Sequence, residues 1–381
     1  MKVLFCHDGP TYVDNKNRYY ACVLSDNLIE RYFWLGDEFT LLNRLRKIEK
    51  TEGLEEIKHK KVNIVSIPNL ATLKGILFDS HKAKKIISDE VRKSDIVIAR
   101  LPGFSGGYAI KYAKKYNKKY FVEMVGCPLD ALSNHSFKGK LIAPVMYIYT
   151  RKLLKKSKYV MYVTNKYLQN KYPTTGYQIG CSDVDISIEN EAIDNRLNKI
   201  NTNNNIITLG TLGTLNMKYK GFDTVIKAIS KINRRNGTKY VYKIMGNGDK
   251  TWLNKVIEQN KVADFVQIFN SVPHKDVFNW LDTEIDIYIQ PSRTEGMPRA
   301  LIEAMSRACL CIGSNAGGIP ELIDSKYIFK KNNIDDLIKI LENIKVEDLK
   351  NQAKINFGKS KDFSIEILNE KRKQFYKKVL K

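Results

Sequence analysis

The stretch PSRTEGMPRALIEAM, residues 291–305, decides how this chain is interpreted, because it lies between two apolar runs. The run before it, IDIYIQ (285–290), is typical of a buried β-strand, and so is the run LCIGS (310–314) that follows. Between the two runs, apolar residues recur at helical spacing, at Leu301, Ala304, Met305 and Ala308. The stretch therefore predicts a strand, a turn and a helix leading to a parallel strand.

The same alternation extends along the whole chain. Further buried strands are predicted at 2–6, 61–67, 95–99, 120–125, 158–163, 206–212, 240–245 and 265–269. Amphipathic helical segments lie between strands, for example at 103–117, 140–156 and 222–235. In the last of these, one face collects Val225, Ile226, Ile229 and Ile232. Strands alternating with helices predict an α/β fold with doubly wound parallel sheets.

Two Rossmann-like αβα domains account for the 381 residues better than one very large domain. We assign residues 1–188 to the first domain and 206–362 to the second. The connection is placed at 189–205, which lacks apolar periodicity and is rich in Asn and charge. Residues 363–381 read as an amphipathic helix that crosses back to the first domain. Ligands of such sheets bind beyond the carboxyl ends of the strands, so a cleft faced by the two domains is the expected site.

Composition narrows the class of protein. No apolar run approaches the ~18 residues that cross a bilayer, and the start MKVLFCHDGP reads as a first strand, so a cytoplasmic protein is expected. The cysteines are scattered and indicate free buried thiols in preference to disulfides or a metal site, at Cys6, Cys22, Cys127, Cys181, Cys309 and Cys311.

The net charge of +23 is concentrated in the first half of the chain. Residues 1–180 hold 32 Lys and Arg against 16 Asp and Glu. Such an excess would attract anionic lipid or nucleic acid. A solvated, lysine-rich surface without a partner is the alternative, and the Lys/Asn bias of the sequence favours it.

The turn before the central helix predicts an anion site. Pro298 suits the first helical position, because proline lacks the N–H that would have no partner there. The free N–H groups around Gly296, Met297 and Arg299, with the positive end of the helix dipole, form a seat for phosphate.

Two carboxylates flank this seat. Glu295 lies just ahead of it, and Glu303 lies inside the helix, ~7 Å further along its axis. Carboxylates accept hydrogen bonds, and the diols of sugars and riboses donate them. A nucleotide sugar has this layout, with hydroxyl groups on both sides of a diphosphate.

The segment EGMPRALIE resembles the E-x7-E motif of the family 4 retaining glycosyltransferases, which have the GT-B fold. The chain is similar to the branch of that family found in bacterial polysaccharide and lipid-linked oligosaccharide synthesis. The specific matches are at 210–229, 291–308 and 316–323, and weaker ones occur at 31–44, 95–102 and 162–173.

The resemblance implies roles for three residues. Glu303 would hold the ribose hydroxyls, Glu295 would contact the transferred sugar, and Lys220 would neutralise the diphosphate. Many relatives carry an Arg shortly before that lysine, whereas this chain has Gly-Thr-Leu at 213–215. Lys218 or Arg299 could supply the second cation instead.

The first domain is expected to contribute to both substrates. Gly9, in HDGP, offers the approach to the donor phosphates that relatives make with a double-Gly loop after the first strand. Asp130 and His135 are candidates for acceptor contact, and a structural role is open for each.

The resemblance implies a retaining transfer of a hexosyl or N-acetylhexosaminyl group from a nucleotide diphosphate sugar, commonly UDP-linked. The acceptor would be a glycan, and a lipid-linked one is favoured, since 138–158 joins an uncharged decad to a dense Lys/Arg run suited to an anionic membrane surface. We therefore expect a peripheral protein at the inner face of the cell membrane. No Asp-x-Asp or His cluster has metal-ligand spacing, so no metal and no cofactor is expected.

Other functions remain open from the sequence. A GT-B epimerase would act on the nucleotide sugar alone. A basic nucleic-acid-binding protein would explain the charge, but no helix-turn-helix, zinc or RNA-recognition motif is visible, so nucleic acid is not an expected partner. A Rossmann dehydrogenase is disfavoured, because no G-x-G-x-x-G follows the first strand.

Overall fold

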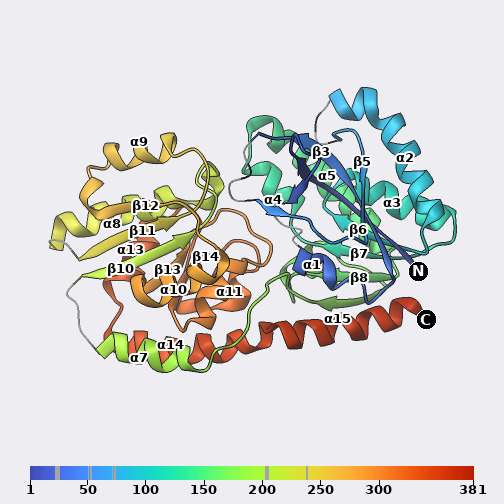
Figure 1. The fold of residues 1–381 in the computed structure, drawn as a ribbon. Coiled ribbons are helices and arrows are strands. Elements are labelled where there is room, and N and C mark those ends of the chain that lie inside the picture. Colours follow the sequence, from blue (N-terminus) through green and yellow to red (C-terminus); the bar gives the residue numbers. More distant parts are fainter. Residues whose placement is uncertain are drawn as a thin grey trace. The chain divides into compact units, whose positions relative to one another are not determined.

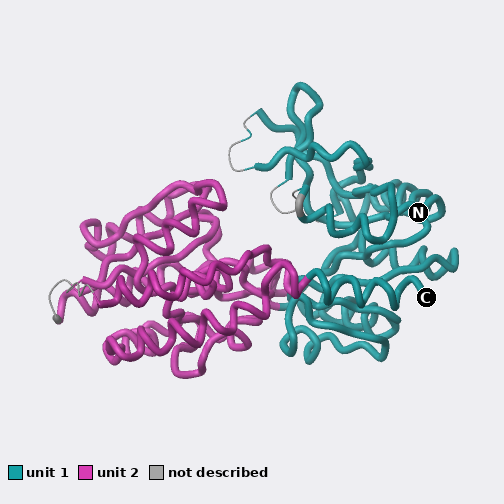
Figure 2. Tube along the Cα trace, turned by 60° about the horizontal axis from the view of Figure 1, so that its bottom comes forward, with its two compact units in different colours: residues 1–129, 142–181, 369–381 teal, residues 130–141, 182–368 magenta. Residues whose placement is uncertain are grey.

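The structure, a computed structural model, describes residues 1–21, 26–49, 51, 54–70, 72, 74–201, 206–236 and 239–381. The chain forms two compact units (Figures 1 and 2). Unit 1 comprises residues 1–129, 142–181 and 369–381, and unit 2 comprises 130–141 and 182–368.

Unit 1 is built on a parallel sheet in the order β5-β3-β1-β6-β7-β8-β9. Its strands are β1 (Lys2–Val13), β3 (Glu38–Lys47), β5 (Val62–Ser66), β6 (Ile96–Leu101), β7 (Lys119–Met124), β8 (Tyr159–Tyr162) and β9 (Tyr177–Gly180). Two short strands, β2 (Tyr19–Ala21) and β4 (Glu55–Glu56), extend it in antiparallel pairing. Every residue of β6 is buried, as expected of a central strand with both faces covered.

The helices in the first half of the chain are α1 (Asp26–Glu30), η1 (Gly75–Asp79), α2 (Ser80–Lys93), α3 (Phe104–Lys115), α4 (Pro128–Ser133), α5 (Phe137–Lys155) and α6 (Tyr167–Lys171). Residues 130–141, which include most of α4 and the start of α5, belong to unit 2, and the other helices in this list lie in unit 1. The last helix of the chain, α15 (Ile365–Leu380), ends in the same unit. Its Phe375 is fully buried, with its ring centroid 5.4 Å from that of Phe121 on β7. The C-terminal helix thus returns to the first unit, as the sequence predicted.

Unit 2 has a second parallel sheet, in the order β12-β11-β10-β13-β14-β15. Its strands are β10 (Ile207–Leu212), β11 (Tyr240–Met245), β12 (Val266–Phe269), β13 (Ile287–Gln290), β14 (Leu310–Ser314) and β15 (Ile328–Phe329). The chain builds this sheet outward from β10 on one side and then resumes at β13 on the other. Parallel sheets bind ligands at such a reversal, beyond the carboxyl ends of the two central strands.

The helices of unit 2 are α7 (Glu191–Asn201), α8 (Phe222–Asn236), α9 (Thr251–Gln259), α10 (His274–Glu284), α11 (Arg299–Ser306), α12 (Ile319–Leu322), α13 (Ile334–Glu342) and α14 (Val346–Ser360). Single turns lie at η2 (Lys218–Lys220), η3 (Ala263–Phe265), η4 (Ser325–Tyr327) and η5 (Lys361–Phe363). The apolar face predicted for α8 is fully buried, at Val225, Ile226, Ile229 and Ile232.

Three local expectations need correction. The segment 189–205 was predicted to be the interdomain connection, without apolar periodicity, but it contains a helix, α7, at 191–201; residues 202–205 lie outside the described residues. Gly9 does not lie in a loop after the first strand, because β1 continues through it to Val13 with a shift of register between Cys6 and Pro10. Pro298 is the residue before α11 and has an extended ψ of 110°, so Arg299 is the first helical residue.

The cysteines agree with free buried thiols at the five positions that the structure describes, namely Cys6, Cys127, Cys181, Cys309 and Cys311. Cys22 lies outside the described residues. Within the described part of the chain, no helix is both long enough and apolar enough to cross a membrane.

Candidate active site

The candidate site lies where the order of strand addition in the sheet of unit 2 reverses, between β10 and β13. Strands β10 and β13 are neighbours there, with Gly210 opposite Tyr288. Lys220 lies in the segment that follows β10, and Glu295 lies in the segment that follows β13. The Lys220 ammonium and the Glu295 carboxylate are 2.6 Å apart. The fold therefore brings together two site residues that are 75 positions apart in the sequence.

Several donors hold the Glu295 carboxylate through one of its two oxygens. Its Oε1 accepts hydrogen bonds from Lys220 Nζ, from Ser292 Oγ at 2.7 Å and from Gln290 Nε2 at 3.1 Å. The side chain is only 13% exposed. The sequence pointed to Glu295 but not to these two neutral donors.

Lys220 keeps its charge at this position. Burial acts to lower its pKa, but the Glu295 carboxylate acts in the opposite direction and prevails, so the pKa lies above the ordinary lysine value. A protonated amine is the form that attracts a diphosphate.

Arg293 fixes the turn that carries Lys220. Its guanidinium donates two hydrogen bonds to the Asp223 carboxylate, at 2.8 and 2.7 Å, and another to the Lys218 carbonyl. Its backbone N–H donates to the Tyr219 carbonyl at 2.7 Å. Both bonds to Asp223 come from the same nitrogen, Nη2, and hydrogen bonds between charged groups are stronger than neutral ones, so this pair helps to hold the two segments in register. Neither Arg293 nor Asp223 was predicted from the sequence.

Glycines allow the segments of the site to pack closely. Gly221 has a φ of +76°, and a Cβ there would lie 2.1 Å from the Pro291 carbonyl oxygen. Gly317 has a φ of +57°, and a Cβ there would lie 2.1 Å from the Glu295 carbonyl oxygen. Gly318 N–H donates to the Gly296 carbonyl at 2.8 Å. The AGG segment at 316–318 therefore supports the turn that carries Glu295.

The amino end of α11 has the character of an anion seat. No side chain caps the helix there, and the residue before it, Pro298, has no N–H. Gly296 is half-buried and Met297 is buried beside the helix start. Amides at a helix start carry partial positive charge, and these face no capping side chain.

Glu303 has a basic partner that the sequence did not predict. Its Oε1 lies 3.2 Å from His274 Nε2, at the start of α10. The hydrogen bond to Glu303 raises the pKa of His274, burial opposes it, and Asp185 adds to the rise while Arg299 reduces it. The imidazole is thus biased toward its charged form beside the carboxylate.

Lys218 and Arg299 are both exposed. The positive charge of Arg299 acts to lower the pKa of Lys220 and that of His274, but in each case it contributes less than the paired carboxylate, which raises the pKa. Lys218 contributes its carbonyl to the turn through Arg293 and Gly221.

The proposed acceptor residues lie in the segment 130–141, which belongs to unit 2. Asp130 is half-buried, and its carbonyl accepts from the side chain of Asn134 at 2.8 Å. His135 is exposed. Asn134 also reaches the Arg293 carbonyl, at 3.5 Å. This contact places the 130–141 segment beside the turn that follows β13.

Gly9 belongs to unit 1, so its role in donor binding stays a prediction. The neighbouring Asp8 has a different, structural role, because its carboxylate accepts from the N–H groups of Phe104 and Ser105 at 2.6 and 2.9 Å and so caps α3.

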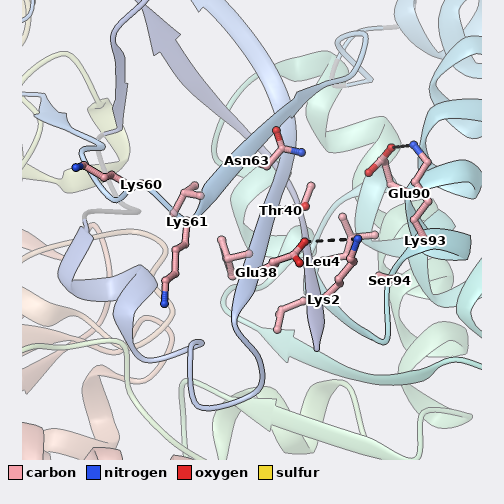
Figure 3. Close-up of a pocket in the computed structure, with 13 residues that line it drawn as sticks. Lys2, Leu4, Glu38, Thr40, Lys60, Lys61, Asn63, Glu90, Lys93 and Ser94 are labelled. Carbon is pink, nitrogen blue, oxygen red and sulfur yellow. Dashed lines mark hydrogen bonds and ion pairs between the residues drawn. The ribbon is translucent and has the colours of Figure 1, made fainter.

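A hollow of about 600 Å³ in unit 1 lies at the amino ends of strands of its parallel sheet (Figure 3). It is lined where β1, β3 and β5 begin, by residues that include Lys2, Glu38 and Val62. Lys2 and Lys93 pair with Glu38 and Glu90, as the dashed lines show. Parallel sheets bind substrates at their carboxyl ends, so we do not assign the active site to this hollow.

Among the residues that the structure describes, no group of three or more His, Cys, Asp or Glu side chains could hold a metal ion. The positive charge of the candidate site comes from Lys220, Arg299 and the amides of α11.

Known proteins resemble this chain along its whole length. Protein CapJ of Staphylococcus aureus is 31% identical over 395 aligned residues, which cover 100% of this chain and 97% of CapJ. The structure of Anabaena Alr3699/HepE in complex with UDP-glucose matches with a TM-score of 0.66 at 13% identity, covering 99% of this chain and 100% of that one. The structure of WaaG, a glycosyltransferase involved in lipopolysaccharide biosynthesis, matches with a TM-score of 0.64 at 14% identity, covering 98% of each chain.

The two structural matches show that the fold is GT-B, as expected from the sequence. The model of the family "Glycosyl transferases group 1" matches residues 189–360, which include Lys220, Glu295 and Glu303. Given this match and the full-length similarity to CapJ, the chain belongs to the group 1 glycosyl transferases.

Proposed function

We propose that this glycosyltransferase moves a hexosyl or N-acetylhexosaminyl group from a nucleotide diphosphate sugar to a glycan acceptor, with retention of configuration. UDP is the favoured nucleotide, since the HepE structure holds UDP-glucose. Cell-surface polysaccharide synthesis is the favoured process, in line with the role stated for WaaG. The observation that carries the proposal is the Lys220–Glu295 pair at the amino end of α11, with Glu303 further along the same helix.

We assign the parts of the donor to the segments around α11 as follows. The protonated Lys220 and the first amides of the helix would hold the diphosphate and stabilise it as it leaves. Glu295 would accept from a hydroxyl of the transferred sugar, and Glu303 would accept from the ribose. Arg299, the first residue of α11, is our choice for the second cation.

Ligand binding tests the donor assignment directly. A thermal-shift screen of UDP, GDP and ADP sugars should give the largest rise in melting temperature with a UDP sugar, because a ligand that binds only the folded protein stabilises it. Glu295→Ala and Glu303→Ala should each remove most turnover of that sugar nucleotide. Full turnover in both variants would refute the site.

We further propose that turnover needs no divalent cation, because Lys220 and the helix start supply the positive charge. Transfer should proceed at an undiminished rate in excess chelator. Complete loss of transfer in chelator, restored by Mn²⁺ or Mg²⁺, would contradict this part.

The acceptor is proposed to be lipid-linked and reached at the inner face of the membrane. Four apolar side chains on one face of α5 are each at least half exposed, at Phe137, Leu141, Val145 and Ile148. The helix ends in a basic turn with Lys152 and Lys155. Exposed apolar residues followed by lysines suit the surface of an anionic bilayer.

Vesicle binding tests the membrane assignment. The double variant Val145→Glu/Ile148→Glu should lose sedimentation with phosphatidylglycerol vesicles at low salt. The control is Val346→Glu/Ile355→Glu, which alters two side chains on α14 that are 50% and 52% exposed. Equal sedimentation of both variants would refute α5 as the contact surface.

A further inference from the structure

Strand β13 carries polar side chains into the core of unit 2. Tyr288, Gln290 and Ser292 alternate along the chain and are at most 1% exposed. Tyr288 and Gln290 lie on β13 and point to the same face of the sheet, and Ser292, two residues beyond the strand, continues the row through its hydrogen bond with Gln290. Polar groups are costly to bury unless they are hydrogen-bonded, and Leu and Phe would fill positions 290 and 288 without that need.

The row is hydrogen-bonded in one direction. The backbone N–H of Leu212, the last residue of β10, donates to the Tyr288 hydroxyl at 3.4 Å. The hydroxyl in turn donates to Gln290 Oε1 at 3.0 Å. Because a backbone N–H can only donate, the hydroxyl hydrogen is left for the amide oxygen of Gln290. The amide nitrogen therefore points the other way.

The row ends on Glu295. Gln290 Nε2 donates to Ser292 Oγ at 2.9 Å and to Glu295 Oε1 at 3.1 Å. Ser292 Oγ donates to the same carboxylate oxygen at 2.7 Å. With Lys220, three donors converge on Oε1. Because these three donors all bind one oxygen, the carboxylate is held in a fixed orientation, and Oε2 is the oxygen left for another donor.

We propose that Tyr288 and Gln290 are positioning residues that orient Glu295, so that its Oε2 accepts a hydrogen bond from one hydroxyl of the transferred sugar. This inference rests on the proposed function, in which Glu295 contacts that sugar. Changes in the buried row should therefore weaken the contact with the sugar of the donor and leave binding of its nucleotide unchanged.

Two substitutions test the row against a matched control. Tyr288→Phe removes the hydroxyl that orients the amide, and Gln290→Leu removes the amide itself. The control, Tyr242→Phe, also removes a buried hydroxyl from the same sheet, but this one donates to Thr211 Oγ1 at 2.9 Å and does not lead to Glu295.

The measurements are UDP affinity by calorimetry and turnover of the UDP sugar selected by the thermal-shift screen. We expect turnover to fall about tenfold in Tyr288→Phe and about a hundredfold in Gln290→Leu, with UDP affinity within about twofold of wild type, since charge-assisted hydrogen bonds are the strong ones. Tyr242→Phe should leave both quantities within about twofold. Wild-type turnover in both test variants, or an equal loss in the control, would overturn the inference.

Gln290→Glu gives a readout that a purely structural role would not produce. The new carboxylate would face Glu295 and Lys220, and it can donate to Glu295 only when it is protonated. Its turnover relative to wild type should therefore rise as the pH is lowered. A ratio that does not change with pH would count against the orienting role.

The same experiments separate this inference from the proposed function. If Glu295→Ala retains full turnover, the proposed site fails and the row has nothing to orient. If Glu295→Ala loses turnover while Gln290→Leu and Tyr288→Phe do not, the site stands and the orienting role is wrong.

Discussion

Removing the ammonium group of Lys220 is the sharpest test of the proposal that this site stabilises a leaving diphosphate. Lys220→Met keeps most of the side-chain volume but deletes the cation that lies 2.6 Å from Glu295 Oε1. Glu295 keeps its bonds from Ser292 and Gln290, so the carboxylate is not left without donors. The fold should survive, at a cost of about 1–2 kcal/mol in the free energy of unfolding.

The effect on the reaction should be larger than the effect on stability. Loss of one preorganised group that stabilises developing charge costs about 3–4 kcal/mol, which is a fall in kcat of about 100- to 1000-fold. UDP affinity should also fall, because the diphosphate loses a partner in the ground state. Steady-state turnover of the sugar nucleotide, calorimetry with UDP and urea unfolding measure the three quantities.

Lys227→Met is the matched control, because it deletes a cation from the same unit. Lys227 is 44% exposed and lies 3.9 Å from Asp223, so its pair contributes little. The control should retain wild-type turnover. If Lys220→Met keeps kcat within about fivefold of wild type, or if kcat falls as much in the control, Lys220 does not stabilise the charge of the leaving group.

Two further predictions follow from the local geometry. Glu303 raises the folded-state pKa of His274, so the stabilisation from the charged imidazole is full below the ordinary pKa of about 6.5 and is lost as pH rises through the higher folded value. The variant His274→Gln keeps a hydrogen-bond donor but no charge. Its melting temperature should therefore lie below that of wild type at low pH and equal it above neutrality. Gly221→Ala should lower the free energy of unfolding in urea by at least about 1–3 kcal/mol, because φ is +76° and the new Cβ would meet the Pro291 carbonyl. Gly358→Ala on α14, where a Cβ meets nothing within 4 Å, should raise it by about 0.5–1 kcal/mol. The opposite order of stability would refute both predictions.

Strands with continuous β-branched and aromatic runs were predictable from the sequence. The strand predicted at 240–245 has the same limits as β11, and the runs at 120–125 and 310–314 agree with β7 and β14. Strand β3 was not predicted, because polar residues interrupt its pattern. Its Asn43 is buried and donates to Thr11 on β1, so a cross-strand hydrogen bond replaces an apolar contact.

Helix α7 was not predicted for a related reason. Arg196 takes the position of an apolar residue on its buried face. The guanidinium donates to backbone carbonyls of Leu281, Ile285 and Arg307, which compensates the burial of the charge. A hydrophobic pattern cannot reveal a helix that is fixed by hydrogen bonds to distant segments.

In the candidate site, the motif located Lys220 and Glu295, which the fold brings into contact. The partners of these residues were not predictable. Arg293 and Asp223 are 70 positions apart, and His274 and Glu303 are 29 apart. A side chain whose role depends on a contact with a remote segment leaves no periodic signal in the sequence.

These partners also change how two acids can flank an anion seat. From the sequence alone, Glu295 and Glu303 have only hydroxyl groups to accept from, which leaves their negative charge facing a diphosphate. In the structure each carboxylate has a basic side chain within hydrogen-bond distance, Lys220 for Glu295 and His274 for Glu303. An opposite charge at that range offsets most of the field of the acid. In the proposed function, both acids would then accept from hydroxyl groups without repelling the phosphates, and a variant that weakens either pair should raise the KM for the sugar nucleotide.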